Sequence, residues 1–167
     1  DSYARIAAAA ARVGSRLFLD CDRAPFRLAL QQGPYLVKPN EHELAQWAGR
    51  PLPSLEDRLS AARELSRETG GWVLLSRGAD GAALVRDRDG ICLQAAAPAV
   101  TVRNTVGAGD AMLAGAIAAA EKDEPATLLR WAVATGCAAT EVPPGRLPTR
   151  RRWRELLGAV AVSAAQL

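Results

Sequence analysis

The sequence predicts an α/β protein with three layers, in which helices cover both faces of a mainly parallel sheet. Short apolar segments with strand character alternate along the chain with longer helical patterns, and this alternation is typical of parallel strands connected by helices. Residues 82–97 carry a hairpin signal instead. We therefore expect an antiparallel part in an otherwise parallel sheet.

The first part of the chain alternates regularly between helix and strand. We expect helices at residues 2–13, 24–32 and 41–48, and buried strands at residues 16–20 and 34–38. A longer helix follows, with Ser54 as its N-cap, Asp57 as the acid three residues later and Gly70 at its end.

The second part begins with the apolar segment WVLLS, a strong strand pattern at residues 72–76. Two further strands are expected at residues 82–87 and 91–97, joined by the turn Arg88-Asp89-Gly90. Helices are expected at residues 108–121, 126–140 and 149–157. Because no repeat or linker interrupts the pattern, we predict a single domain over residues 1–167.

Composition narrows the functional class. The 167 residues are 49% hydrophobic and 23% charged, as in ordinary globular proteins, and no apolar run is long enough to span a bilayer. Three widely spaced cysteines and a single histidine lack the spacing of a disulfide framework or a zinc site. We expect a cytoplasmic protein with no export leader and no membrane partner.

The densest basic segment is TRRRWRELL at residues 149–157. Arginines at this density could hold the phosphates of a nucleic acid. They could also be the water-facing side of a C-terminal helix that Glu155, Leu156 and Leu157 continue. We favour the helix and predict no nucleic-acid partner.

The segment NTVGAGDAMLAGAI combines small residues with an acid. Gly107, Ala108 and Gly109 precede Asp110 where a helix is expected to begin. Unpaired backbone N–H groups and the positive end of the helix dipole favour an anion there. Asp110 alone could be explained as a first-turn acid that stabilises the helix, but that explanation leaves the two glycines without a purpose.

Two other turns follow expected strands. In KPNEHEL, Asn40 and Glu43 either cap a helix or hold magnesium through water. Lys38 in the same turn is either a phosphate-pairing charge or a solvated strand end.

The third turn is SRGADG, at residues 76–81. Its glycines, Gly78 and Gly81, allow positive φ angles and a close approach of bare backbone to a nucleotide phosphate. The same glycines also suit an ordinary turn between two strands.

TVGAGDAMLAGAI, with KPNEHELAQWAG and LLSRGADGAALV before it in that order, resembles the ribokinase, or PfkB, family of carbohydrate kinases. The strongest resemblance is to the 1-phosphofructokinase and tagatose-6-phosphate kinase branch, from about Leu17 onwards. It implies a ribokinase-like fold of which this chain is the C-terminal part. Neither the N-terminal sugar-binding half nor the β lid of the family is visible, and TEVPPGRLP, at residues 140–148, departs from the usual adenine-side loop.

The resemblance also implies a set of site residues and two cofactors, ATP and Mg²⁺. Asp110 becomes the catalytic base that addresses the sugar hydroxyl, while Asn40 and Glu43 organise the water shell of magnesium. The backbone from Gly107 through Ala108 and Gly109 to Asp110 becomes an anion hole for the transferred phosphoryl group. The nucleotide-binding residues are then Lys38, Ser76, Arg77, Gly78, Ala79, Asp80, Gly81, Ala108 and Gly109.

The implied activity is an ATP-dependent sugar-phosphate kinase. Fructose 1-phosphate, giving fructose 1,6-bisphosphate, is the first expected substrate, and tagatose 6-phosphate is the second. The alternative is a non-catalytic nucleotide-binding module that needs a partner chain. Expected partners are the small-molecule substrates and either a second copy of the chain or a complementing N-terminal half.

Overall fold

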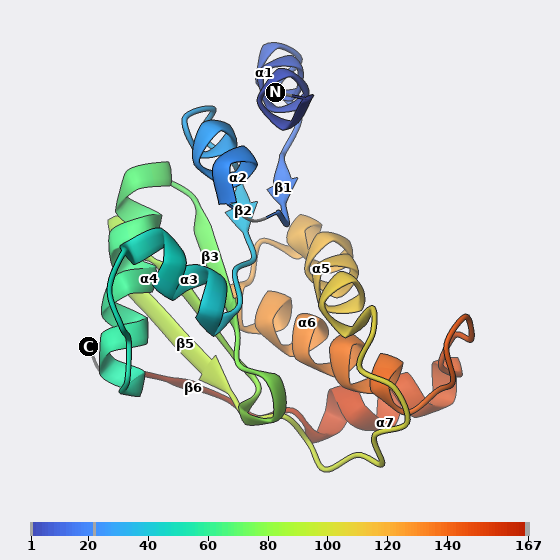
Figure 1. The fold of residues 1–167 in the computed structure, drawn as a ribbon. Helices are drawn as coiled ribbons and strands as arrows, with labels where there is room; N and C mark the ends of the chain where they lie inside the picture. The colour runs from blue at the N-terminus through green and yellow to red at the C-terminus, as the bar shows by residue number, and fades with distance from the viewer. Residues whose placement is uncertain (1, 22, 166–167) are drawn as a thin grey trace. The chain divides into compact units, whose positions relative to one another are not determined.

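The computed structural model describes residues 2–21 and 23–165 (Figure 1). In chain order the helices and strands are α1 (Ser2–Arg12), β1 (Phe18–Leu19), α2 (Arg23–Leu30), β2 (Leu36–Val37), α3 (Glu41–Ala48), α4 (Leu55–Thr69), β3 (Trp72–Ser76), β4 (Ala82–Arg86), β5 (Ile91–Ala95), α5 (Ala108–Ala119), α6 (Pro125–Thr140), α7 (Arg150–Ala159) and β6 (Val162–Ala164). Three 3₁₀ turns are η1 (Gly78–Asp80), η2 (Asp87–Asp89) and η3 (Ala120–Lys122).

The strands form a six-stranded mixed sheet in the order β1-β2-β3-β4-β5-β6. β1, β2 and β3 are parallel, with Leu36 opposite both Phe18 and Trp72. β5 and β6 are antiparallel, with Gln94 opposite Ser163. The predicted combination of parallel strands, helices and an antiparallel part is therefore confirmed. β6 itself was not expected.

The chain divides into two compact units. The first contains the chain up to Ser76, residues 83–92 and Ala165, and the second contains residues 77–82 and 93–164. Each unit is described separately below. The single domain over residues 1–167 stays a prediction.

The core of the first unit is built by the strands and by helix α4. Leu36, Val37, Val73 and Leu75 are completely buried, as is Leu65 of α4. Burying apolar side chains of this size provides most of the favourable free energy of folding.

Both ends of α4 follow the sequence prediction. Ser54 Oγ accepts a hydrogen bond from the Asp57 amide (3.0 Å), and Asp57 Oδ2 accepts one from the Ser54 amide (3.1 Å). Gly70 has φ of +70°, the left-handed conformation that ends a helix. The helix is therefore capped at both ends.

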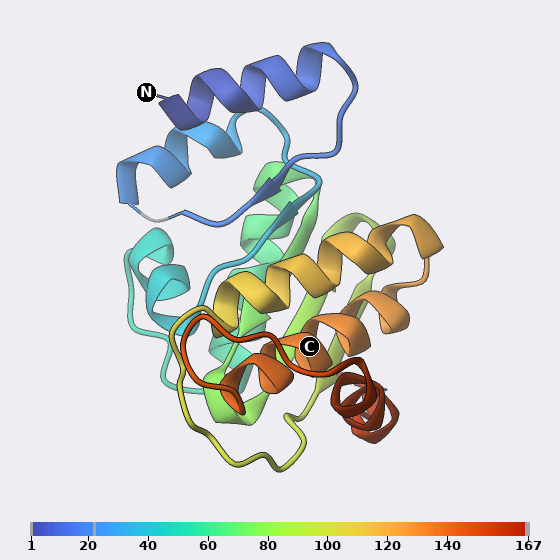
Figure 2. The same cartoon turned by 90° about the vertical axis from the view of Figure 1, so that its right-hand side faces the viewer.

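The core of the second unit is the contact between α5 and α6, which lie side by side in Figure 2. Two glycines make this approach possible. A Cβ atom on Gly115 would lie 2.6 Å from the Trp131 carbonyl oxygen, and one on Gly136 would lie 3.3 Å from the Ala108 carbonyl oxygen. Any side chain at Gly115 would force the helices apart.

Within the described residues, none of the helices has the combination of length and apolar character needed to cross a bilayer.

The close backbone packing around Gly71, just before β3, allows a test of how steric fit contributes to the stability of the first unit. A Cβ atom on Gly71 would lie 2.2 Å from the Pro34 carbonyl oxygen and 2.9 Å from that of Tyr35. Because both obstacles are backbone atoms, we expect Gly71→Ala to lower the free energy of unfolding by about 2 kcal/mol or more. Urea denaturation of the purified protein measures this change.

Gly158→Ala is the matched control. Gly158 lies within α7, and apart from neighbouring backbone of the helix itself no atom lies within 4 Å of the position that an alanine Cβ would take there. Alanine at this position should therefore raise stability by up to about 1 kcal/mol. Equal effects of the two substitutions would contradict the steric explanation.

Candidate functional site

In the first unit, polar residues gather where β2 and β3 end. Asn40 is the N-cap of α3, and its Oδ1 accepts a hydrogen bond from the Glu43 amide (2.9 Å). Glu43 Oε2 accepts one from the Asn40 amide (2.8 Å), which completes a capping box. Asn40 also pairs with Ser76 as an isolated bridge, and the Ser76 amide donates to the Pro39 carbonyl (3.0 Å). The structure therefore brings Asn40, Glu43 and Ser76 to one edge of the sheet.

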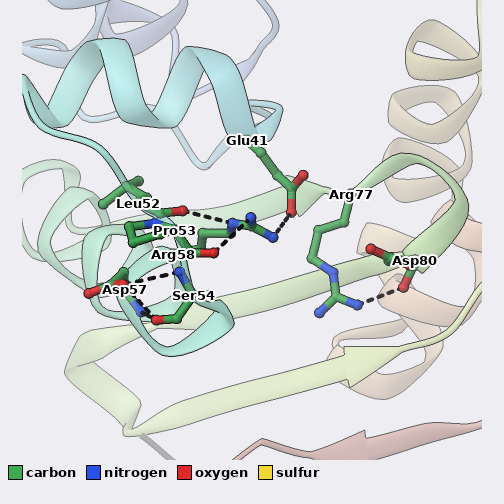
Figure 3. A network of polar contacts seen from close by, with 8 residues as sticks. All are labelled: Glu41, Leu52, Pro53, Ser54, Asp57, Arg58, Arg77 and Asp80. Carbon is green, nitrogen blue, oxygen red and sulfur yellow. Dashed lines mark hydrogen bonds and ion pairs between the residues drawn. The ribbon is translucent and has the colours of Figure 1, made fainter.

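The turn around Asn40 is braced by an arginine from α4. Figure 3 shows Arg58 donating to Glu41 Oε1 (2.6 Å) and to the carbonyl oxygens of Leu52 (3.0 Å) and Pro53 (3.2 Å). Glu41 is the residue directly after Asn40. Arg58 therefore ties the start of α3 to the segment that leads into α4.

Lys38 is buried, with only 6% of its side chain exposed, and its Nζ lies 2.8 Å from Asp20 Oδ2. Asp20 directly follows β1 as Lys38 follows β2, so adjacent parallel strands bring the two together. The interpretation of Lys38 as a solvated strand end is wrong. Sequence reasoning also missed Asp20, although an acid directly after an apolar strand was a signal that could have found it.

In the second unit, the 77–81 turn is held by its own backbone. The Arg77 amide donates to the Gly81 carbonyl (2.9 Å), and the Arg77 guanidinium donates to the Asp80 carbonyl (2.7 Å; Figure 3). Gly78 and Gly81 have φ of +56° and +89°. A Cβ atom on Gly81 would also lie 2.0 Å from the Ala95 carbonyl oxygen. Both glycines are needed for the turn itself, and Gly78, Ala79 and Asp80 are exposed.

Helix α5 begins as the sequence predicts. Gly107 is its N-cap, with φ of +82° and no side-chain cap. The Asn104 side chain closes the preceding turn, since it donates to the Val106 carbonyl (3.1 Å) and accepts from the Val106 amide (3.2 Å).

Asp110 is exposed in the first turn of α5, after Ala108 and Gly109. Amides at the start of a helix have no partner within the helix, and the dipole adds positive potential there. The first turn of α5 therefore places backbone amides that are suited to an anion beside an exposed carboxylate.

A cavity of about 570 Å³ lies beside this helix start, entirely within the second unit. Figure 2 shows the segment after α6 returning past the start of α5 before α7 begins. The lining is mainly apolar, and consists of Asn104, Val106, Gly107, Ala111, Ala114, Thr135, Ala139, Val142, Pro143, Pro144, Gly145, Arg146, Leu147, Pro148, Arg150 and Trp153. Its size is in the range of small-molecule sites.

Two side-chain contacts hold the walls of the cavity. Arg152 of α7 donates to both oxygens of Glu141 (2.7 and 2.8 Å), which fixes the segment after α6. These hydrogen bonds lower the pKa of Glu141 and raise that of Arg152. Trp153 Nε1 donates to Thr135 Oγ1 (3.0 Å), which joins α7 to α6.

The basic segment predicted at residues 149–157 forms helix α7. Besides its contact with Glu141, Arg152 pairs with Glu155 (3.2 Å), and Arg151 pairs with the same acid (3.6 Å). Arg150 lines the cavity. Several arginines of the run are thus engaged within the second unit.

The possible magnesium ligands are few. Among the described residues no three His, Cys, Asp or Glu side chains form a cluster that could hold a metal. Mg²⁺ usually binds through one or two carboxylates, with waters and substrate phosphates completing the shell. The capping box uses Glu43 Oε2 and Asn40 Oδ1, and a carboxylate offers about four acceptor positions. Asn40 and Glu43 therefore fit water-mediated binding.

The family model and the similar sequences both point to carbohydrate kinases. Residues 1–150 match the sequence model of the pfkB family of carbohydrate kinases. A 1-phosphofructokinase of Rhodobacter capsulatus is 45% identical over 120 residues, which cover 72% of this chain and 37% of the relative. A 1-phosphofructokinase of Xanthomonas campestris pv. campestris is 37% identical over 172 aligned positions, covering 98% of this chain and 53% of the relative. The chain thus spans about half the length of such relatives, or less.

Solved structures of carbohydrate kinases are also similar to this chain. Phosphofructokinase-2 from Escherichia coli, in complex with substrates and products, superimposes with a TM-score of 0.86 at 29% identity, over 95% of this chain and 52% of that one. Arabidopsis thaliana ribokinase, complexed with ribose and ATP, superimposes with a TM-score of 0.80 at 26% identity, over 93% and 52%. These matches confirm the ribokinase-like three-layer α/β fold.

The Glu141 contact predicts a pH-dependent stability. Because its folded pKa is lowered, the carboxylate stabilises the native structure above its ordinary pKa of 4.5, and this stabilisation is lost as the pH falls through the lowered value. Glu141→Gln should therefore lower the Tm at about pH 7, and the difference from the wild type should shrink towards about pH 3.

Thermal unfolding followed by circular dichroism across this pH range is the measurement. Glu155→Gln is the matched control, since Glu155 contacts Arg152 with a single longer bond (3.2 Å), and its effect at neutral pH should be smaller. A Glu141→Gln deficit that does not depend on pH would contradict the assignment.

Proposed function

The chain belongs to the pfkB family of carbohydrate kinases, and from this premise we propose that it is the ATP-binding, catalytic part of a sugar-phosphate kinase. The reaction is transfer of the terminal phosphoryl group of ATP to a hydroxyl of a ketose phosphate. Fructose 1-phosphate, giving fructose 1,6-bisphosphate, is the first candidate because relatives named 1-phosphofructokinase share up to 45% identity with the chain. Tagatose 6-phosphate is the second.

One observation carries this proposal: the start of α5 and the neighbouring cavity lie in the same compact unit. The cavity of about 570 Å³ takes the base and ribose, and Gly107 is part of its lining. The phosphates then lie at the α5 start, where backbone amides and the helix dipole favour negative charge. The second unit by itself thus offers a surface for the base and one for the phosphates of ATP.

Asp110 is the proposed catalytic base. It lies on the turn that holds the phosphates and is exposed. The Asp110 carboxylate accepts the proton of the attacking hydroxyl as the hydroxyl oxygen bonds to the terminal phosphorus. The bond from that phosphorus to the bridging oxygen breaks, and ADP leaves. Amides from Gly107 to Asp110 stabilise the charge on the transferred group, as an anion hole does.

The first unit supplies the proposed cation-binding residues. Asn40 and Glu43 would hold the waters of a magnesium ion, which supplies positive charge for phosphates when it is bound. Lys38 can donate to a phosphate while it remains paired with Asp20, since an ammonium has three donors. The turn at residues 76–81 presents exposed backbone, at Gly78, Ala79 and Asp80, for contact with ATP.

The length of the chain supports a second candidate. Because it spans 53% or less of the 1-phosphofructokinases cited above, the second candidate is a nucleotide-binding module that turns over only with a complementing N-terminal half, or as a homodimer. The cytoplasm is the proposed location, since Cys92 and Cys137 form no disulfide among the described residues.

An ADP-release assay with fructose 1-phosphate tests the proposal, and tagatose 6-phosphate is the comparison substrate. The chain is assayed alone and together with the N-terminal half of a relative. Turnover in either arrangement supports the kinase. Binding of ATP without turnover in both would favour the non-catalytic module.

We expect Asp110→Asn to reduce kcat by about 10²- to 10⁴-fold, because an amide cannot accept the hydroxyl proton. The Kd for ATP should change little, since the phosphate-binding amides remain. Asp123→Asn is the matched control, because asparagine tolerates the left-handed conformation of Asp123 (φ of +50°). An Asp110→Asn enzyme with undiminished kcat would exclude Asp110 as the base.

We expect Glu43→Gln to raise the magnesium concentration needed for half-maximal activity by about 10- to 100-fold. Glutamine retains an acceptor oxygen for the Asn40 amide, so the capping box persists while the charge is lost. Asp57→Asn makes the same change in the equivalent capping box of α4 and should leave the magnesium requirement unaltered. Equal requirements in both variants would argue against a role for Glu43 in cation binding.

A further inference from the structure

A second cavity, of about 470 Å³, lies entirely within the first unit. It lies at the amino ends of β1, β2 and β3, because the residues directly before these strands line it. Lys38, Asn40 and Ser76 lie at or just after the carboxyl ends of the same strands. Three arginines, Arg16, Arg86 and Arg88, give this arginine cavity its charge, and no acidic residue is found among the described residues that line it.

Aromatic rings hold two of the three arginines. The guanidinium carbon of Arg16 lies 4.9 Å from the centre of the Tyr35 ring, and that of Arg86 lies 3.8 Å from the centre of the Trp72 ring. Stacking of this kind covers a flat face of the guanidinium, whereas the N–H donors point outwards in its plane. The donors are therefore oriented before any ligand binds, which reduces the conformational entropy lost on binding.

Positive charge exceeds negative charge around the arginine cavity. Asp89 forms an ion pair with Arg86, and its Oδ1 lies 3.8 Å from Arg88 Nε, which is beyond hydrogen-bond distance. The Arg88 side chain is 64% exposed. Asp87, the other acid of this turn, is engaged by two arginines of α4. A single carboxylate thus accompanies the lining arginines, and each guanidinium has five N–H donors.

Helices α1, α2 and α4 end beside this cavity, and the C-terminal end of a helix disfavours an anion. The partial negative charge there resides on carbonyl groups that lack a partner. At the end of α4, however, the Ser66 carbonyl accepts from the Gly70 amide (2.8 Å), and the Leu65 carbonyl accepts from Thr69 Oγ1 (3.1 Å). Carbonyls at the ends of α1 and α2 likewise accept amides of the turns that follow. This capping reduces the repulsion that an anion would meet.

From these contacts we infer that the arginine cavity binds the phosphate group of a small phosphorylated metabolite, at a site separate from the proposed catalytic one. A guanidinium can pair with two phosphate oxygens at once, and a phosphate monoester carries about two negative charges at neutral pH. The volume of the cavity leaves space for the organic part of such a molecule. Ser15 and Tyr35 in the lining add hydroxyl groups that can bind its polar atoms.

A titration of the ¹⁵N-labelled protein with glucose 6-phosphate, without ATP, tests this inference by amide NMR. Gly70 and Gly71 line the arginine cavity, and Gly107 lies at the start of α5. We expect the Gly70 and Gly71 amides to shift and to saturate with a Kd below about 1 mM, the upper end of ordinary metabolite affinities. The absence of saturable shifts at both glycines would overturn the inference, and the arginines would then only complement the helix ends.

A matched pair of variants tests the role of the arginines. Arg88→Gln should weaken binding at Gly70 and Gly71 by at least about tenfold, because it removes charge-assisted hydrogen bonds. Arg50→Gln removes the same charge from the surface of the same unit, where Arg50 pairs with Glu64 outside the cavity, and should change the Kd by no more than about twofold. Equal weakening in both variants would indicate general electrostatic attraction and overturn the inference.

Inorganic phosphate and glucose are the comparison ligands. We expect inorganic phosphate to bind more weakly than glucose 6-phosphate, and glucose not to bind. Equal affinity for inorganic phosphate and glucose 6-phosphate would show that the site takes free phosphate, and would overturn the assignment to a phosphorylated metabolite.

The inference does not rest on the proposed function, and the two glycine regions separate them. Shifts at Gly70 and Gly71 that persist in a protein without kinase activity would leave the inference standing. Shifts confined to Gly107 would support an anion site at the start of α5 and overturn the inference.

Discussion

The close approach of α5 to α6 determines the geometry of the second unit. Gly115 allows it, because a side chain there would collide with the Trp131 carbonyl and with Thr135. Thr135, held at this contact, is also the acceptor for Trp153 of α7. One steric constraint thus connects three helices, and the cavity and the first turn of α5 are formed by those helices and the segments between them.

Local stability and proposed function coincide at the helix starts. Asn40 and Glu43 form the capping box of α3, which stabilises the start of that helix whatever the protein does. Gly107 adopts the left-handed conformation at the start of α5. The same groups are suited to waters of magnesium and to phosphate, because a helix start concentrates unpaired donors and positive potential. A structural explanation for a residue therefore does not compete with a functional one at these positions.

In each unit, a basic side chain is stabilised by an ion pair with a neighbouring carboxylate. Lys38 is buried only because Asp20 lies 2.8 Å away, since an unpaired ammonium in that position would carry a large desolvation cost. Arg152 is used in a similar way at the surface of the second unit, where Glu141 and Glu155 receive its guanidinium. The basic segment of α7 is consequently a structural element of the cavity wall.

Much of this protein was predictable from the sequence because the signals are local. Ser54, Asp57 and Gly70 mark the ends of α4 within one helical turn of each end, and the glycines before Asp110 mark the start of α5. Short-range patterns of this kind depend on hydrogen bonds and backbone conformations within a few residues of the helix end. The alternation of strands and helices was readable for the same reason.

The remaining features needed tertiary structure. Strand β6 pairs with β5 across about seventy residues of sequence, Asp20 meets Lys38 only through the pairing of β1 with β2, and the cavity is lined by residues from 104 to 153. The hydrophobic periodicity of a sequence carries no information on contacts between residues this far apart in the chain. The sequence by itself therefore determined the elements other than β6, the caps of α4 and the motifs that point to phosphoryl transfer. Only the tertiary structure decided which charges are paired and which polar groups remain for a ligand, because both depend on packing between segments far apart in the chain.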